Sequence, residues 1–152
     1  AGSKVIKSRR YAMKVSWNPA QPLKGIARAA EPKAGELGVY LLFSDDGIVY
    51  AGSGELLTAL RRHAQPDTAD DPQLRAYLEA RHRQITYSYF VEQNDARRLG
   101  AEAFILLLRE RLGLLNKNEA SADPIYVNPP QAEVFGRRVS SNGTWKSLFR
   151  DD

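Results

Sequence analysis

The sequence predicts an α+β domain built on a small, mostly antiparallel β-sheet flanked by helices. Three observations predict this class: a strand-turn-strand pattern over residues 38–50, an isolated strand pattern over 84–92, and helical patterns between and after them. With 152 residues and 43% hydrophobic content, the chain can bury a real core. We expect a basic N-terminal arm at 1–35, a core at 36–118 and a C-terminal extension, 119–152, packed on that core.

A β-hairpin is the first predicted element of the core. Residues 39–43 are apolar on both faces, which indicates a strand covered on two sides. The turn follows at 44–47, Ser-Asp-Asp-Gly, where Gly47 can adopt the left-handed backbone that a tight turn needs. Residues 48–50 form the return strand.

The length of the hairpin loop decides where two tyrosines point. We favour a three-residue loop, 45–47, which pairs Leu42 with Tyr50. Cross-strand partners share a face, as do residues two apart on one strand, so Tyr50 then lies on the same face as Tyr40. A two-residue loop would instead pair Phe43 with Tyr50 and place the two phenols on opposite faces.

Three helices are predicted after the hairpin. The first starts at residue 53 or 54 and runs to about 64, and the second runs from an Asp-Pro start at 71 to about 83. The strand at 84–92 follows. The longest helix runs from 94 or 95 to 112, is apolar around most of its circumference, and ends at Gly113.

The N-terminal region has weaker signals. Short strands are predicted around 5–6 and 13–17, followed by an irregular or partly helical basic arm over 21–35. This arm could lie along a phosphate backbone or cover a sheet edge, and both interpretations stay open. Residues 1–3, Ala-Gly-Ser without an initiator Met, are typical of residues left by a cloning sequence.

The composition excludes several kinds of site. The chain has no Cys, which excludes disulfides, thiolate zinc sites and cysteine nucleophiles, and it has only two His. A metal would therefore be a hard cation held by carboxylate and water, meaning Mg²⁺ or Mn²⁺. No apolar run approaches the length of a membrane span and no signal peptide is visible, so we expect no membrane partner and an intracellular site of action.

The net charge of +4 and the pI of about 9.4 permit nucleic-acid binding without establishing it. Basic residues are concentrated between positions 4 and 33, where eight Lys and Arg occur. Scattered basic residues that keep a small domain soluble would explain the same charge.

Two short motifs flank the predicted hairpin. They are Gly38-Val39-Tyr40 and Tyr50-Ala51-Gly52, and they resemble the two triplets of the GIY-YIG nuclease superfamily. The resemblance covers roughly residues 36–118 and implies the GIY-YIG-like fold and a metal-dependent DNA endonuclease. The alternative is that Tyr40 and Tyr50 are ordinary strand aromatics that pack within a sheet.

The helix after the second triplet departs from the family at one position. The family pattern Leu-x-x-Arg-Leu-x-x-His falls on residues 56–63, but Ala59 occupies the position of the catalytic arginine. Three explanations stay open: an engineered knockout, a naturally degenerate nuclease, or replacement by Arg62. Arg62 lies about 60° from Ala59 around the helix, whereas Arg61 lies about 160° away and is the poorer substitute.

Glu102 matches the family's metal-binding glutamate. The family places this residue on a helix between Ala and aliphatic residues, and residues 101–105, Ala-Glu-Ala-Phe-Ile, fit that pattern. A carboxylate on a mostly buried helix needs a partner, and a divalent cation supplies one. The alternative is an exposed Glu paired with Arg98 or Arg109.

Asn116 completes the match, although it follows Glu102 by fourteen residues rather than the usual dozen, and Asn118 is a second candidate. The resemblance thus implies the catalytic positions Tyr40, Tyr50, Ala59, Arg62, His63, Glu102 and Asn116, with Glu102 as the metal ligand. Nucleic-acid contacts are expected from Arg61, Arg62, Arg9 and Arg10.

The resemblance implies hydrolysis of DNA phosphodiester bonds with a single Mg²⁺ or Mn²⁺ on Glu102. Tyr40 would help to activate water by passing its proton towards His63, and Tyr50 would orient the water or the phosphate. Two other classes stay open on the same fold: a nucleic-acid-binding module without catalysis, and a module that binds a protein partner such as an inhibitor or immunity protein.

Overall fold

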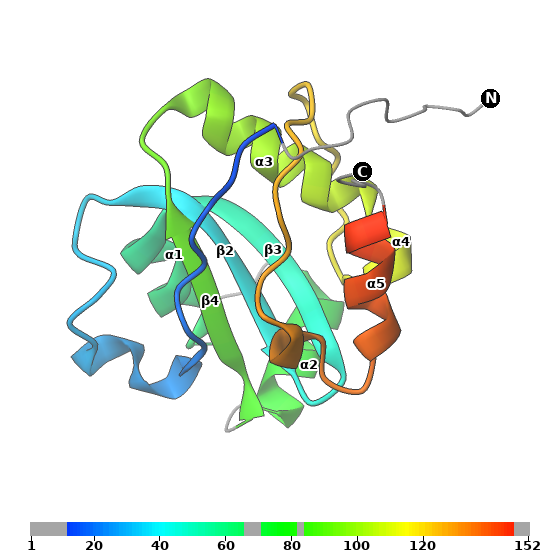
Figure 1. The fold of residues 1–152 in the computed structure, drawn as a ribbon. Helices are drawn as coiled ribbons and strands as arrows, with labels where there is room; N and C mark the ends of the chain where they lie inside the picture. The colour runs from blue at the N-terminus through cyan, green and yellow to red at the C-terminus, as the bar shows by residue number, and fades with distance from the viewer. Residues whose placement is uncertain (1–11, 66–70, 82–83, 148–152) are drawn as a thin grey trace.

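The computed structural model describes residues 12–65, 71–81 and 84–147. Helices cover both faces of a four-stranded antiparallel sheet (Figure 1), so the predicted α+β class is confirmed. The strands lie in the order β1-β4-β2-β3, which makes β3 an edge strand. Their bounds are Gln21–Pro22 for β1, Leu37–Ser44 for β2, Gly47–Glu55 for β3 and Thr86–Val91 for β4.

The helices divide between the two faces of the sheet. On one face, η1, α1 and α2 pack against alternate residues of β2, and on the other face α3, α4, η4 and α5 pack against the remaining ones. In Figure 1, α1 and α2 lie behind the sheet, whereas the segment that leads to η4 and α5 crosses in front of it. The helix bounds are Leu23–Arg28 (η1), Leu56–His63 (α1), Pro72–Ala80 (α2), Asp95–Leu107 (α3), Arg109–Leu112 (α4), Ala132–Phe135 (η4) and Val139–Ser147 (α5).

The hairpin differs from the prediction in its loop but not in its register. Only Asp45-Asp46 connect the paired strands, so the predicted three-residue loop is wrong. A β-bulge leaves Val49 without a partner on β2, and this extra residue compensates for the shorter loop. Leu42 therefore pairs with Tyr50 as predicted, and Gly47 has the expected positive φ, 111°.

The first two helices begin at caps. α1 begins later than predicted because β3 continues to Glu55, whose carboxylate accepts a hydrogen bond from the Thr58 backbone N at 2.8 Å. Asp71 caps α2 as predicted and accepts from the Gln73 backbone N at 3.2 Å. α2 ends at Ala80, before the predicted residue 83.

The predicted long helix is two helices. Asn94, one of the two predicted starting positions, caps α3, but regular α-helix stops at Leu107, and α4 continues after Leu108. Gly113 ends α4 with a φ of 74°, as expected for a C-terminal glycine. β4 is shorter than the predicted strand at 84–92, and it pairs with β2 in the same sheet as the hairpin, as predicted.

The N-terminal arm covers a sheet edge. β1 pairs with β4, and the Leu23 backbone N at the start of η1 donates to Ile85 O at 2.9 Å. This is one of the two interpretations that the sequence left open for residues 21–35. The predicted strand at 13–17 is wrong apart from an isolated bridge between Met13 and Val127, and the one at 5–6 lies outside the described residues.

The C-terminal segment packs on the face that α3 covers. Trp145 of α5 is fully buried, its Nε1 donates to Val127 O at 2.8 Å, and its ring meets Phe104 of α3 edge-to-face with 5.8 Å between centroids. This packing helps to fix α3 against the sheet. None of the described helices is long and apolar enough to cross a membrane.

Gly38 lies where β2 approaches β4, and it has no room for a side chain. A Cβ at this position would collide with Phe90 O and would lie 2.9 Å from Leu56 Cδ1. We expect Gly38→Ala to lower the free energy of unfolding by about 1–3 kcal/mol, because the backbones of two central strands must separate. Urea denaturation measures this loss.

Gly25→Ala is the matched control for Gly38→Ala. Gly25 lies in η1, and no neighbouring atom lies within 4 Å of a Cβ placed there. We expect this variant to retain the urea midpoint of the parent protein. An equal loss of stability in both variants would contradict the steric explanation.

Candidate functional site

Two tyrosines and a histidine form the centre of the candidate site. Tyr40 of β2 and Tyr50 of β3 lie on the same face with their rings stacked, 6.4 Å between centroids and 29° between planes. His63, the last residue of α1, lies 5.5 Å from the Tyr40 ring and 5.0 Å from the Tyr50 ring. A 2.7 Å hydrogen bond joins Tyr40 Oη to His63 Nε2. The fold therefore brings these three predicted residues together.

Gly52 makes the contact between the phenol and the imidazole possible. It pairs with Tyr40 across the β2–β3 ladder, and a Cβ on Gly52 would collide with the Tyr40 phenol. The ring can therefore lie across the β3 backbone. Leu56 and Leu60, both fully buried, hold α1 against this face and bring His63 to the phenol.

The imidazole and the phenol are both neutral at pH 7. Burial, and to a lesser extent the nearby Arg62 guanidinium, lowers the pKa of His63 to about 4. Burial raises the pKa of Tyr40, as do charges at Tyr50 and Glu102, whereas Arg62 opposes this shift. Within the described part of the chain, Nδ1 of His63 is buried without a hydrogen-bond partner. The Tyr40–His63 bond therefore holds one proton between two neutral groups.

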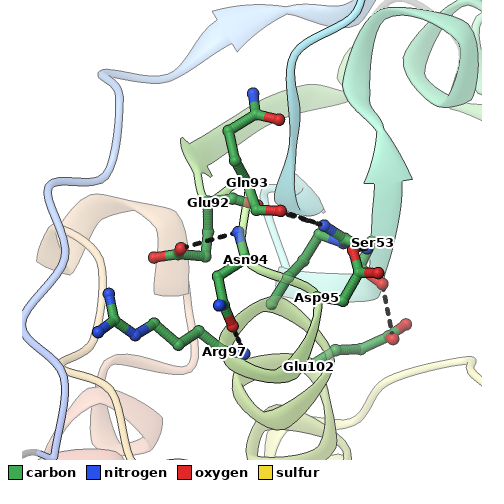
Figure 2. Close-up of polar contacts among 8 residues, drawn as sticks. Ser53, Glu92, Gln93, Asn94, Asp95, Arg97 and Glu102 are labelled. Atoms are coloured by element: carbon green, nitrogen blue, oxygen red, sulfur yellow. Dashed lines mark hydrogen bonds and ion pairs between the residues drawn. The ribbon is translucent and has the colours of Figure 1, made fainter.

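Glu102 lies on α3, which covers the face of the sheet opposite to the three rings. Its Oε1 accepts a 2.8 Å hydrogen bond from Ser53 Oγ, and Figure 2 shows the two side chains meeting beside α3. Burial raises the pKa of Tyr50, and the Glu102 charge raises it further, so the carboxylate acts electrostatically on the tyrosine pair. β3 is the edge strand, which lets a side chain from the α3 face approach the opposite face around that edge.

Glu102 does not form either of the ion pairs that the sequence left open for it. Arg98 pairs with Asp95, with 2.6 Å between Nη2 and Oδ1, and Arg109 pairs with Glu119, with 3.6 Å between Nη2 and Oε2. The guanidinium of Arg98 also donates to the backbone carbonyls at the end of β4, which ties the start of α3 to the sheet.

One oxygen of the Glu102 carboxylate is available to a ligand. The side chain is half-buried, and its Oε2 has no hydrogen-bond partner among the described residues. Residues 12–65, 71–81 and 84–147 contain no group of three or more His, Asp and Glu side chains that could hold a metal ion. A cation here would bind one protein carboxylate and take its other ligands from water or phosphate.

α1 carries two arginines, Arg61 and Arg62, shortly after the uncharged Ala59. Ala59 is half-buried against the core below α1 and brings no charge to the site. Arg62 is exposed on α1, and its charge lowers the pKa of both partners in the phenol–imidazole bond. Arg61 is also exposed. Arg9 and Arg10, the other predicted nucleic-acid contacts, lie outside the described residues.

Asn116 holds the outer edge of β3. Its Nδ2 donates to Ala51 O at 2.7 Å, and its Oδ1 accepts from the Ala51 backbone N at 2.9 Å. The Leu115 backbone N adds a 2.7 Å bond to Val49 O, and Asn118 Oδ1 accepts from Nδ2 of Asn116 at 3.1 Å. Asn116 is therefore a positioning residue for the second triplet, since these bonds fix the strand that carries Tyr50.

Sequence reasoning missed three residues near the site. Ser53 could have been found, because period-two alternation on β3 places it on the same face as Ala51, towards α3. The other two form an ion pair, with 3.1 Å between Lys117 Nζ and Asp71 Oδ1. Nothing in the sequence pairs two positions that lie 46 residues apart.

The buried imidazole should make stability depend on pH. His63 has a pKa of about 4 in the folded chain and about 6.5 when unfolded, so the unfolded state binds a proton first as the pH falls. We expect this contribution to be complete above pH 6.5 and to be lost by about pH 4, at a cost of about 3 kcal/mol. An NMR titration of the ring gives the pKa directly.

His63→Gln is the reference for this measurement, because glutamine keeps a polar group beside Tyr40 but does not titrate. The difference in unfolding free energy between parent and variant should shrink as the pH falls from 6.5 to 4. A difference that stays constant over that range would contradict a buried, neutral His63.

Comparison with known proteins gives no match for this chain. No family model matches it, and neither the curated proteins nor the solved structures include one with significant similarity to it.

Proposed function

We propose that this chain is a divalent-metal-dependent endonuclease that hydrolyses DNA phosphodiester bonds at a GIY-YIG-type site, and that Ala59 leaves it slow or inactive. The observation that carries the proposal is the 2.7 Å hydrogen bond between Tyr40 and His63. The Tyr40 ring also stacks on Tyr50, and the charge of Glu102 acts on its phenol. An ordinary pair of strand tyrosines would not need a buried imidazole with an unpartnered nitrogen, which typically costs about 1–3 kcal/mol.

The Tyr40–His63 pair is suited to moving a proton. Hydrolysis needs a water molecule that loses a proton as it attacks phosphorus. In the proposed step, the phenol oxygen of Tyr40 accepts that proton while its own proton passes to Nε2 of His63. This relay avoids a free phenolate, which burial disfavours at neutral pH, and it places the proton on His63, from which burial and the Arg62 charge favour its release. Tyr50, half-buried beside both rings, would orient the water or the phosphate.

The residues present fit a hard divalent cation. Glu102 would hold Mg²⁺ or Mn²⁺ through Oε2, while the Ser53 hydroxyl keeps Oε1 in place. When bound, such a cation supplies positive charge to the phosphoryl oxygens and the leaving group. A single carboxylate is a sparse site, so we expect weak binding in the absence of DNA.

With alanine at position 59, the proposed site lacks the arginine charge that the GIY-YIG family has there. Loss of one donor that stabilises transition-state charge typically costs about 2.7–4 kcal/mol, or roughly 10²–10³ in rate. Arg62 carries its charge close to Tyr40 and His63, so it would supply part of this stabilisation. The parent chain should therefore bind DNA but cleave it slowly or undetectably.

Ala59 also favours a second candidate function, a nucleic-acid-binding module that has lost catalysis. In this case the basic α1 surface retains salt-sensitive affinity for DNA or RNA. Neither the metal nor Glu102 would affect that affinity. The cleavage test below separates the two candidates.

Restoring the arginine tests the proposal. We expect Ala59→Arg to produce nicking of supercoiled plasmid that requires Mg²⁺ or Mn²⁺, because the guanidinium supplies the missing charge one turn before His63. Adding Glu102→Ala to this variant should abolish the nicking. Gel electrophoresis measures both effects.

Thr58→Arg is the matched control. Thr58 is an exposed neighbour on α1 and the same charge is added, but about 100° around the helix from Ala59. This variant should bind DNA more tightly without gaining cleavage. Absence of cleavage in a folded Ala59→Arg variant, or equal cleavage in both arginine variants, would count against the proposed site.

A further inference from the structure

We propose that Lys117 is a phosphate-binding side chain of this site. Its ammonium group pairs with the Asp71 carboxylate until a backbone phosphate of DNA takes the place of that carboxylate. This inference rests on the proposed function, because it assigns the DNA contact beside Tyr50. It concerns the ion pair between the segment after α4 and the N-cap of α2.

The position of Lys117 is set by β3. The residue before it, Asn116, is held by two hydrogen bonds to Ala51, the neighbour of Tyr50. The Lys117 backbone is therefore anchored to the edge of the strand that carries the second phenol. Its side chain remains 61% exposed and ends 3.1 Å from the Asp71 carboxylate, so the ammonium group is accessible to a ligand.

The charge of Asp71 acts on Tyr50. Burial raises the pKa of this phenol first, and the charges of Glu102 and then Asp71 raise it further. Two carboxylates thus act on Tyr50 from different elements. Both carboxylates would repel a phosphate placed there. The phosphate therefore needs a cation beside it, and the ammonium group of Lys117 can supply one.

Lys117 is suited to this exchange. Exposed ion pairs contribute little to stability, so breaking the one with Asp71 costs little. A phosphate offers the ammonium group a charged acceptor in place of the carboxylate. Arg62 carries its charge beside Tyr40 and His63, so the two cations would bracket a phosphate lying over the stacked rings.

Four proteins test the inference by fluorescence anisotropy with a labelled DNA duplex in EDTA: the parent, Lys117→Gln, Asp71→Asn and the double variant. Lys117→Gln should weaken binding roughly five- to tenfold at 0.1 M salt and reduce the slope of log affinity against log salt by about 0.9. Asp71→Asn should strengthen binding severalfold, because asparagine keeps the α2 cap and frees the ammonium group. In the Lys117→Gln background, Asp71→Asn should strengthen binding much less than it does in the parent, because only the relief of charge repulsion remains.

The controls separate this contact from a general effect of charge. Lys146→Gln removes the same charge from an exposed position on α5 and should change binding less than twofold. If Lys117→Gln behaves like Lys146→Gln, or if Asp71→Asn strengthens binding equally when Lys117 is absent, the inference is overturned.

Failure of the proposed function would look different. If the parent protein does not bind the duplex at all, the inference falls with the proposed function. If the parent binds but a folded Ala59→Arg does not cleave, the endonuclease proposal fails, while the four-protein series still tests the Lys117 contact. If the parent binds and Ala59→Arg cleaves while Lys117→Gln has no effect, only the inference on Lys117 fails. Urea midpoints equal to that of the parent show that the variants are folded.

Discussion

The candidate site depends on one steric constraint, the absence of a side chain at Gly52. The Tyr40 phenol occupies the space where a Cβ would lie, and from there it reaches Nε2 of His63. The bulge at Val49 supports the same arrangement, because without it the two-residue loop would place Tyr50 on the opposite face. A short hydrogen bond between two side chains thus rests on the register of a hairpin, and that register depends on a single extra residue.

The edge position of β3 explains how residues from both faces of the sheet can act together. α1 lies on the Tyr40 face and α3 on the other, so in the middle of the sheet the strands would separate His63 from Glu102. At the edge, no further strand intervenes among the described residues. Asn116 pairs with the backbone of Ala51 there, which satisfies its polar groups without adding a strand that would cover the site.

Local patterns predicted much of this architecture. Alternation along residues 39–43 predicted a strand buried on both faces, and helix caps at Asp71 and Asn94 were readable from residue type and spacing. The loop length was wrong, yet the face of Tyr50 was right because the bulge cancels the error. Bulges depend on packing around the strand, which a linear pattern does not contain. The Ser53–Glu102 bond spans 49 residues, and it forms only because the sheet brings β3 to α3.

In the proposed mechanism, the electrostatics of the Tyr40–His63 pair would make a cation at position 59 matter more than it would in an open site. Burial keeps both His63 and Tyr40 neutral, which favours a shared proton but disfavours the negative charge that develops on the phenol side during proton transfer. Arg62 already opposes the shift in the Tyr40 pKa, so a positive charge on this helix acts on the phenol as well as on any bound phosphate. In the proposed mechanism, an arginine at position 59 would have both effects from one turn before His63. In that mechanism, alanine removes a positive charge that would stabilise the phenol oxygen and the phosphate, although the same charge would oppose protonation of His63. Arg62, further along α1, would supply part of this charge.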